Sequence, residues 1–322
     1  MKPRVSIIIP TWNRKDLALT CLDSVQGQTF RSWEAIVVDD GSADGTAEAV
    51  AREHPDAQVV RLEKNSGFCA AANAGIARAG AELMLLLNND MTLEPGFLNR
   101  LITAADKSDA ALFAPLVLFR DEPEFVYSAG DRLLANGRPE SVGFRCRRVQ
   151  FQFPPEIFGV SAGAGLYRRE VFDAVGALDE RFIAYFEDSD LSFRARLAGY
   201  RAEFVEDAVA YHIGSASIAN RQWWRARQCY RNHALLVVKN MPAALLLRHA
   251  RAILTERVHQ LRQVVSSARC EFGLIKALGV AFGAWLSMLA ALPHALRERR
   301  RIQRMVRVDA NDLEQLMRTE RD

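Results

Sequence analysis

The sequence predicts an α/β fold with a mostly parallel central sheet, followed by a helical C-terminal region. Over the first 115 residues, short apolar runs alternate with amphipathic segments, which is the pattern of a βαβ series with right-handed crossovers. Polar clusters follow the apolar runs, as expected where parallel strands end at one edge of a sheet. At 322 residues, of which 49% are apolar, the chain can bury a full core and carry an appendage.

The spacing of apolar residues defines the N-terminal elements. Strands are predicted at 5–9, 35–38, 58–62, 83–87 and 111–113. Helices are predicted at 16–25, 46–52, 69–79 and 95–105, and Pro95, which has no N–H, suits the first turn of the last one. Four polar strand ends then lie on one rim, at residues 11–13, 39–42, 64–67 and 88–90.

Residues 116–160 are less regular, because Gly and Pro repeatedly interrupt their apolar pieces. We expect this segment to be a loop region that contacts substrate. Order returns at 161–167 and in a helix at 169–175. A second helix at 188–198 ends at Gly199, and a strand at 204–211 leads into His212.

The C-terminal region differs in charge and in pattern. Residues 242–322 hold 14 Lys and Arg against 8 Asp and Glu, a balance of +6 in a chain whose net charge is +3. We therefore divide the chain into a main domain at 1–241 and a helical region at 242–322. Residues 277–293 are almost wholly apolar, and Arg299, Arg300 and Arg301 follow them. This suits a helix in a membrane interface with arginines on anionic headgroups, and a buried helix or a dimer interface fits nearly as well.

Composition excludes several classes of protein. The five cysteines are odd in number, far apart and without a C-x-x-C pair, which argues against a disulfide framework and a zinc site and favours a reducing cytoplasm. The apolar run 5–9 is too short for an export signal. No basic stripe with interleaved aromatics crosses the main domain, so we expect no nucleic-acid partner.

Two stretches place carboxylates where a chain normally exposes a site. Asn88, Asn89 and Asp90 close a buried strand, and the run from Glu187 to Asp190 opens a helix, whose N-terminus tolerates negative charge. A polyphosphate with a metal ion would bring the two stretches together. A purely structural reading of the second stretch is an acidic helix start in which Asp190 pairs with Arg194 at i+4.

The motifs at these positions resemble, in order and spacing, those of the inverting family 2 glycosyltransferases of GT-A fold. The resemblance covers roughly residues 4–240 and rests on VSIIIPTWNR at 5–14, VVDDGS at 37–42, LLLNND at 85–90 and YFEDSDL at 185–191. Within this family, three features are most similar to a rhamnosyltransferase-like branch that builds bacterial surface polysaccharides. They are the Asn-Asn-Asp form, the loop at Gly67 and Phe68 followed by Asn73, and Tyr230-Arg231-Asn232.

The resemblance implies a role for each matched residue. Asp90 is the expected ligand of Mn²⁺ or Mg²⁺, and Asn88 departs from the family's usual Asp-x-Asp. His212, before the loop 213–217, is the expected second ligand, although a hydrogen-bonded core histidine is the other interpretation. Asp188 is the expected general base, with a pKa raised by its acidic neighbours, and Glu187 an acceptor-binding residue. The donor nucleotide is expected to contact Pro10, Thr11, Asn13, Asp40, Gly67, Asn73, Asn88 and Asn89. For Asp40 and Ser42, the alternative is a turn that caps the helix at Thr46.

We therefore expect a metal-dependent, inverting hexosyltransferase that uses a nucleotide-sugar donor, dTDP-rhamnose by branch resemblance or else a UDP-hexose. Its acceptor would be lipid-linked or a polysaccharide, and it would work in the cytoplasm, peripheral on the inner face of the membrane, alone or as a homo-oligomer. A nucleotidyltransferase is disfavoured because residues 10–13 are not a Gly-rich phosphate loop. A receiver domain is disfavoured because its acidic pair would follow the first strand. A non-catalytic nucleotide-sugar-binding relative stays open.

Overall fold

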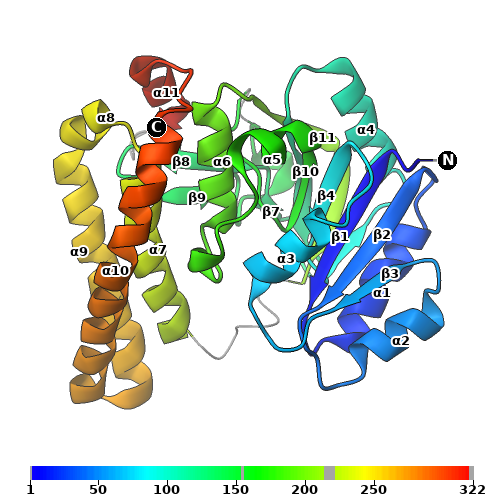
Figure 1. Ribbon diagram of the computed structural model, residues 1–322, viewed down its shortest axis with the longest axis horizontal. Coiled ribbons are helices and arrows are strands. Elements are labelled where there is room, and N and C mark those ends of the chain that lie inside the picture. Colours follow the sequence, from blue (N-terminus) through cyan, green and yellow to red (C-terminus); the bar gives the residue numbers. More distant parts are fainter. Residues whose placement is uncertain (1, 154–155, 214–221, 319–322) are drawn as a thin grey trace.

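The computed structural model describes residues 2–153, 156–213 and 222–318, and it forms a nine-stranded mixed sheet covered by helices (Figure 1). The strand order is β3-β2-β1-β4-β10-β6-β11-β5, with β7 paired to β6. The strands are β1 (Val5–Thr11), β2 (Trp33–Asp39), β3 (Gln58–Arg61), β4 (Leu83–Leu87), β5 (Met91–Leu93), β6 (Leu112–Phe119), β7 (Val126–Ser128), β10 (Ala164–Arg168) and β11 (Ala202–His212).

The predicted parallel βαβ series is confirmed in β3, β2, β1 and β4, which pair in parallel. The other half of the sheet is mixed. Strand β10 lies antiparallel between β4 and β6, and β5 is antiparallel to β11. The four polar strand ends therefore share one rim, as predicted.

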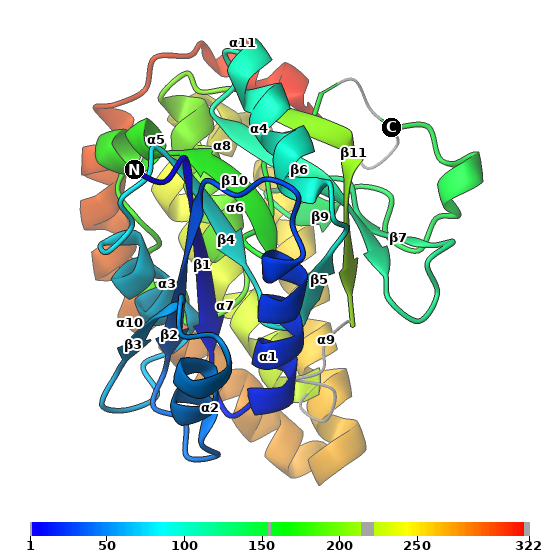
Figure 2. The same ribbon diagram turned by 90° about the vertical axis from the view of Figure 1, so that its right-hand side faces the viewer.

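Helices cover both faces of the sheet (Figure 2). The first six are α1 (Lys15–Gln26), α2 (Thr46–Glu53), α3 (Phe68–Ile76), α4 (Phe97–Lys107), α5 (Arg169–Val175) and α6 (Glu187–Leu197), with short 3₁₀ turns η1 (Arg148–Gln150) and η2 (Glu180–Phe182). Side chains of β1 alternate between two cores: Ile7 and Ile9 pack with α1 and α4, whereas Ile8 packs with α3. Pro95 lies outside the first helical turn, because α4 begins at Phe97 after a turn at Gly96.

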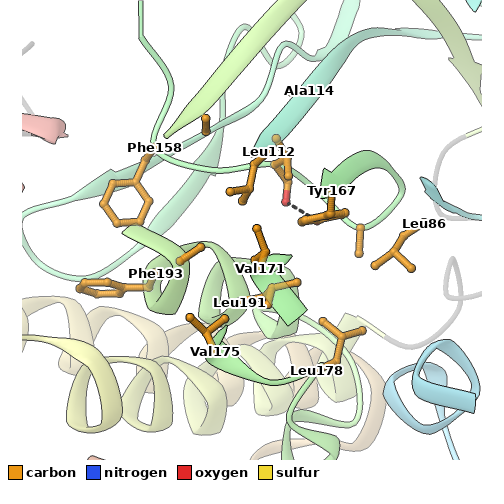
Figure 3. Packing of buried hydrophobic residues seen from close by; sticks show 14 of the residues in the cluster. Leu86, Leu112, Ala114, Phe158, Tyr167, Val171, Val175, Leu178, Leu191 and Phe193 are labelled. Carbon is orange, nitrogen blue, oxygen red and sulfur yellow. Dashed lines mark hydrogen bonds between the residues drawn. The ribbon is translucent and has the colours of Figure 1, made fainter. Parts of the chain in front are cut away.

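The larger core lies between the sheet and α5 and α6. Figure 3 shows Val171 of α5 and Leu191 of α6 facing Leu112 of β6 and Tyr167 of β10, with Phe193 of α6 beside Phe158. The Tyr167 hydroxyl in this core donates to Val160 O at 3.2 Å. This core fixes α6, and with it the first turn that carries the predicted catalytic acids.

The segment predicted to be irregular is more ordered than expected. Strand β6 extends to Phe119, β7 follows, and β8 (Asp131–Leu134) and β9 (Pro139–Ser141) form a hairpin in a second, three-stranded sheet with β12 (Met317–Arg318). Gly137, at φ 82°, makes the hairpin turn, and a Cβ there would lie 2.4 Å from Val237 Cγ2. Glycines in this segment therefore mark turns between strands.

The C-terminal region is helical, as predicted. It follows α7 (Gln222–Asn240) and consists of α8 (Ala243–Arg248), α9 (Ala250–Phe272), α10 (Leu274–Gln303) and α11 (Ala310–Leu316). Helices α7, α9 and α10 pack as a layer beside the main sheet (Figure 1). Among the described residues, α10 is the one helix long and apolar enough to cross a membrane by length and composition.

Candidate active site

A pocket of about 380 Å³ opens at the carboxyl ends of β1, β2 and β4. The loop just before β10 (residues 161–163), the loop and first turn of α6 and the last residue of β11 complete its walls. Ten of the twelve residues predicted from the sequence line it: Pro10, Thr11, Asp40, Gly67, Asn88, Asn89, Asp90, Glu187, Asp188 and His212. Asn13 and Asn73 do not appear in this wall, although both touch loops that build it.

Asp40 fixes the loop between β3 and α3. Its Oδ1 accepts a hydrogen bond from Ser66 N at 2.7 Å, and its Oδ2 accepts one from Gly67 N at 2.9 Å. Burial raises the pKa of Asp40, and these two hydrogen bonds oppose the rise. Each carboxylate oxygen keeps a lone pair for a further donor. Gly67 has φ 93°, a conformation that glycine adopts without strain.

Asn13 stabilises the neighbouring loop instead of lining the pocket. Its backbone N–H donates to Ser42 Oγ at 2.9 Å, and its Oδ1 accepts from Ala43 N at 2.8 Å. At the start of α2, the N–H of Thr46 donates to Asp44 Oδ1 at 3.1 Å. Asp44 thus accepts from the first N–H of α2, whose N-cap position is Gly45, and neither Asp40 nor Ser42 caps this helix.

Asn73 has a different position from the predicted one. The Asn73 side chain, on α3, makes two hydrogen bonds with the backbone of Leu178. Its Nδ2 donates to Leu178 O at 2.9 Å, and its Oδ1 accepts from Leu178 N at 3.0 Å. This pair joins α3 to the segment that leads into α6. Asn73 thus acts on the pocket through the loop and not as part of the wall.

Asp90 and His212 meet at one side of the pocket. The antiparallel register of β5 and β11 pairs His212 with Met91, so its imidazole Nε2 lies 3.1 Å from Asp90 Oδ1. Both side chains are nearly buried, and among the described residues Asp90 Oδ1 and His212 Nδ1 have no hydrogen-bond partner. Nearby, Asn89 Nδ2 donates to Thr11 Oγ1 at 2.8 Å.

This pair fits a divalent cation as a partial ligand set. A carboxylate oxygen and an imidazole nitrogen are donors that Mn²⁺ accepts, and the buried Oδ1 of Asp90, which accepts no hydrogen bond from the described residues, can coordinate a cation. Within residues 2–153, 156–213 and 222–318, no three His, Cys, Asp or Glu side chains gather as a complete ligand set. Oxygens from a bound diphosphate would have to complete the coordination. Residues 214–217, which follow His212, lie outside the described part of the chain.

A strained loop delivers α6 to the pocket. Ile183, Tyr185 and Phe186 all have positive φ, between 66° and 70°, which costs energy for residues with a Cβ. Asn232 of α7 stabilises this loop, since its Nδ2 lies within 2.8–2.9 Å of the carbonyls of Phe182, Ala184 and Tyr185. The sequence signal was the Tyr230-Arg231-Asn232 motif, whose physical role the structure supplies.

Asp188 lies in the first turn of α6, at the pocket wall. Its Oδ1 accepts from Ser189 N at 2.7 Å and its Oδ2 from Ala162 N at 3.2 Å. Burial raises the pKa of Asp188, and hydrogen bonds to Ser189, Ala162 and Ser161 partly offset that rise. The expected direction is therefore correct, but burial is the main cause instead of repulsion from acidic neighbours.

Glu187 carries the larger perturbation. Burial, with repulsion from Asp188, raises the pKa of Glu187 to about 8, and its Oε2 has no hydrogen-bond partner within the part of the chain that the structure describes. Asp190 points away from this chemistry, because Arg194 Nε lies 2.9 Å from its Oδ2 and Lys239 Nζ lies 2.9 Å from its Oδ1. These two cations hold the pKa of Asp190 below its usual range despite burial. The predicted i,i+4 pair of Asp190 and Arg194 is confirmed.

Sequence reasoning missed an aromatic part of the wall. Tyr127, from β7, packs edge-on against His212 with ring centroids 4.3 Å apart. Tyr185 and Trp12 also line the pocket, and Trp12 is 51% exposed. Trp12 sits inside a matched motif and could have been found there. Tyr127 lies in the segment without clear periodicity, where no signal marked it.

Comparisons with known proteins identify the family and the fold of this chain. A family model described as "Glycosyl transferase family 2" matches residues 6–176. The chain is 28% identical over 217 residues to the N-acetylglucosaminyl-diphospho-decaprenol L-rhamnosyltransferase of Mycobacterium tuberculosis, covering 59% of this chain and 70% of that protein.

Two other relatives are much longer than this chain. It is 29% identical over 245 residues to the O-antigen biosynthesis protein RfbC of Myxococcus xanthus, covering 71% of this chain and 19% of that protein. It is also 29% identical over 231 residues to the uncharacterized protein y4gI of Sinorhizobium fredii, covering 67% of this chain and 25% of that protein. The match therefore spans about a fifth and a quarter of their lengths.

The fold is shared with a solved structure, that of the mannosyltransferase PcManGT from Pyrobaculum calidifontis in complex with GDP-Man and Mn²⁺. The TM-score is 0.58 at 18% sequence identity, and the superposition covers 95% of this chain and 86% of that one. At this identity the likeness shows the fold alone.

Proposed function

Because the chain belongs to glycosyl transferase family 2, we propose that it transfers a sugar from a nucleotide-diphosphate donor to an acceptor hydroxyl, with inversion at the anomeric carbon. One observation carries this proposal: a single pocket holds both the Asp90–His212 pair and the buried carboxylates of Glu187 and Asp188. The Asp90–His212 pair can hold a cation that binds the diphosphate, and a carboxylate of the second group can accept the proton of the attacking hydroxyl. The pocket therefore contains both groups that the reaction requires.

The donor is proposed to be dTDP-rhamnose. The rhamnosyltransferase named among the relatives supports this sugar, and a UDP-hexose is the alternative. The nucleoside would contact Asp40, Thr11 and Gly67, where the carboxylate lone pairs left by Ser66 and Gly67 can accept from a pyrimidine N–H. Pro10, Asn88 and Asn89 would line the path toward the diphosphate.

Asp188 is proposed as the general base. The acceptor oxygen attacks the anomeric carbon, its proton passes to the Asp188 carboxylate, and the bond from that carbon to the diphosphate oxygen breaks. The raised pKa of Asp188, caused by burial, makes the carboxylate a better proton acceptor. A divalent cation, Mn²⁺ or Mg²⁺ held by Asp90 and His212, would neutralise charge on the leaving diphosphate.

Glu187 is proposed to hold the acceptor. With a pKa near 8 it is mostly protonated at neutral pH, so its carboxyl group can donate a hydrogen bond to an acceptor oxygen. Tyr127 and Tyr185, which line the pocket, would contact the acceptor sugar. The acceptor is proposed to be lipid-linked or a polysaccharide, in bacterial surface polysaccharide synthesis at the cytoplasmic face of the membrane. Residues 1–241 would be the catalytic domain and 242–322 a helical appendage.

The test is donor turnover by the purified full chain. Release of nucleoside diphosphate from dTDP-rhamnose and from UDP-hexoses is measured with Mn²⁺, with Mg²⁺ and with EDTA, using N-acetylglucosaminyl-diphospho-decaprenol as the acceptor. We expect metal-dependent release of dTDP and an inverted product linkage by NMR. Thermal stabilisation by nucleotide sugars without release from any of them would identify a binding protein and overturn the proposal.

A further inference from the structure

Helix α10 has its small residues inside and its large residues outside. The buried positions between residues 274 and 298 are alanines: Ala277, Ala281, Ala284, Ala291 and Ala295. The outward positions are bulky and apolar, with Ile275 87% exposed and Phe282 60% exposed. A helix that packs on the core of a protein in water shows the reverse arrangement.

The exposed apolar residues form one continuous stripe, which we call the α10 face: Leu274, Ile275, Leu278, Phe282, Trp285, Leu286 and Leu289. Their spacing of three and four residues places them on one side of the helix. The rings of Phe282 and Trp285 stack at 6.0 Å. Monomeric proteins in water rarely expose so long an apolar patch without a partner.

The inner side of the same helices is partly polar. Glu256 and Gln260 of α9 are buried and bond to each other at 2.7 Å, beside the cluster of Tyr230, Val264 and Ala281. Small residues and buried polar side chains between helices, with large apolar residues outside, are typical of helices in contact with lipid.

The other half of α10 is part of the main core. Ala291, Ala295 and Ile302 pack in the same cluster as the sheet, and Arg299 donates to Val238 O at 2.9 Å and to Met241 O at 2.7 Å. Arg299 is therefore engaged with α7 and is not the free headgroup ligand expected from the sequence. This attachment keeps α10 on the catalytic unit, so the helix can lie on a bilayer but not leave the unit to cross one.

Charge identifies the partner of the α10 face. Between residues 262 and 290 the chain holds three basic residues and one acidic one, and Arg262, Arg269 and Lys276 are all exposed. In a two-fold dimer through this face, both copies would present the same patch, so the basic residues around it would face each other and repel. An anionic bilayer offers apolar depth and the opposite charge at once.

Aromatic contacts connect the α10 face to the pocket. Phe272, at the turn between α9 and α10, packs against Trp223 at 5.6 Å. The next residue, Trp224, contacts Tyr185 of the pocket wall at 6.1 Å, and the Arg225 guanidinium lies 5.5 Å from the Tyr185 ring. The first turn of α7 thus bridges the hairpin tip and the pocket.

We propose that the α10 face lies in the interface of an anionic bilayer, with Phe272 and the first turn of α7 at its edge. The pocket wall at Tyr185 then stands next to the lipid surface, where a lipid-linked acceptor would be presented. This orientation of the acceptor rests on the proposed function, whereas the docking surface itself does not.

The first experiment is vesicle sedimentation of the full chain. The probes are phosphatidylcholine vesicles with and without phosphatidylglycerol. We expect binding that is stronger with phosphatidylglycerol, and a loss of about tenfold or more in the variant Ile275→Gln, Leu278→Gln, Phe282→Gln. The matched control is Leu247→Gln with Leu254→Gln, since these residues are equally exposed but lie outside the α10 face. The control should bind like wild type.

A second measurement reports contact with lipid directly. Brominated phosphatidylcholine, mixed with phosphatidylglycerol, should quench part of the tryptophan fluorescence, and Trp285→Phe should remove much of that quenching. Arg269→Gln with Lys276→Gln should weaken binding to phosphatidylglycerol vesicles and leave weak binding to phosphatidylcholine unchanged. Unquenched fluorescence in wild type bound to vesicles would show that another surface makes the contact.

Donor turnover measured in the same samples separates the two proposals. Wild type that turns over donor but stays in the supernatant overturns the docking surface and leaves the proposed function intact. Vesicle binding without donor turnover overturns the proposed function and leaves the docking surface intact. A wild-type dimer that the Ile275, Leu278 and Phe282 substitutions convert to a monomer, without vesicle binding, would assign the α10 face to a second copy and overturn the proposal.

Discussion

The side-chain amide of Asn232 donates to the carbonyl of Tyr185 at 2.8 Å, and so a helix near the end of the catalytic fold holds the loop that carries the pocket's acids. Two further carbonyls, of Phe182 and Ala184, share that amide. Without it, three residues at positive φ would have no such compensation for their strain.

Asn232→Ala should therefore weaken both the fold and the reaction. Loss of a buried donor to these carbonyls should cost about 1–3 kcal/mol of unfolding free energy, measured by urea denaturation. Turnover should fall while nucleotide affinity changes little, because Asp40 and Thr11 lie elsewhere in the pocket. Asn99→Ala, at an exposed position on α4, is the control. Normal turnover in the Asn232 variant would mean that the loop does not depend on this amide.

Asp188→Asn should abolish transfer and leave donor binding within a few-fold. The amide cannot take the acceptor proton, a loss that typically reduces rates by about 10² to 10⁴. Steady-state rates and calorimetric donor affinity give the two readouts, with Asp173→Asn on the exposed side of α5 as the control. A turnover close to wild type would assign the base to another residue.

Asp90→Ala should remove metal-dependent binding of nucleoside diphosphate, and His212→Ala should weaken it less. A carboxylate brings formal charge to the cation and a neutral imidazole does not, so the losses should differ. Calorimetric titration of dTDP with and without Mn²⁺ measures both. Equal affinity in wild type and the Asp90 variant would show that the cation is held elsewhere.

Glu187 should make the fold less stable as pH rises. Its pKa is about 8 in the fold against an ordinary value of 4.5, so between these values the folded chain binds a proton that the unfolded chain has released. Unfolding free energy then falls with pH, by at most about 1.4 kcal/mol per pH unit. Urea denaturation of wild type and Glu187→Gln between pH 5.5 and 8 tests this: the difference should grow in favour of the Gln variant. A constant difference would place the Glu187 pKa outside the range.

The parts of the site that the sequence predicted are those at strand ends. Leu83 to Leu87 is a continuous apolar run, and Val5 to Ile9 is interrupted only by Ser6. Both become buried parallel strands, so the polar residues after them meet at one rim. The start of α6 was also predictable from the sequence, because its acidic residues and its apolar residues lie together in one short motif.

The parts that were missed depend on long-range contacts. Tyr127 reaches the pocket only because β7 pairs with β6, and nothing in its local pattern indicates that pairing. Asn13 and Asn73 are polar residues beside the right motifs, but they satisfy backbone groups of loops instead of facing the pocket. Composition showed that α10 is apolar, yet which side of it faces outward depends on the alanines that pack on α7 and α9.

The attachment of the last helices to the main core has a consequence for biosynthesis. One buried cluster contains both Ile8 of the first strand and residues near the C-terminus, namely Ala291, Ile302, Leu313 and Met317. A ribosome delivers the N-terminal strands first, yet the cluster stays open until nearly the whole chain has emerged. The α10 face is thus assembled in the same late step that closes the core. A chain that ends before α10 would leave this buried cluster uncovered where Ala291 and Ile302 pack, which makes premature termination in this region a route to aggregation.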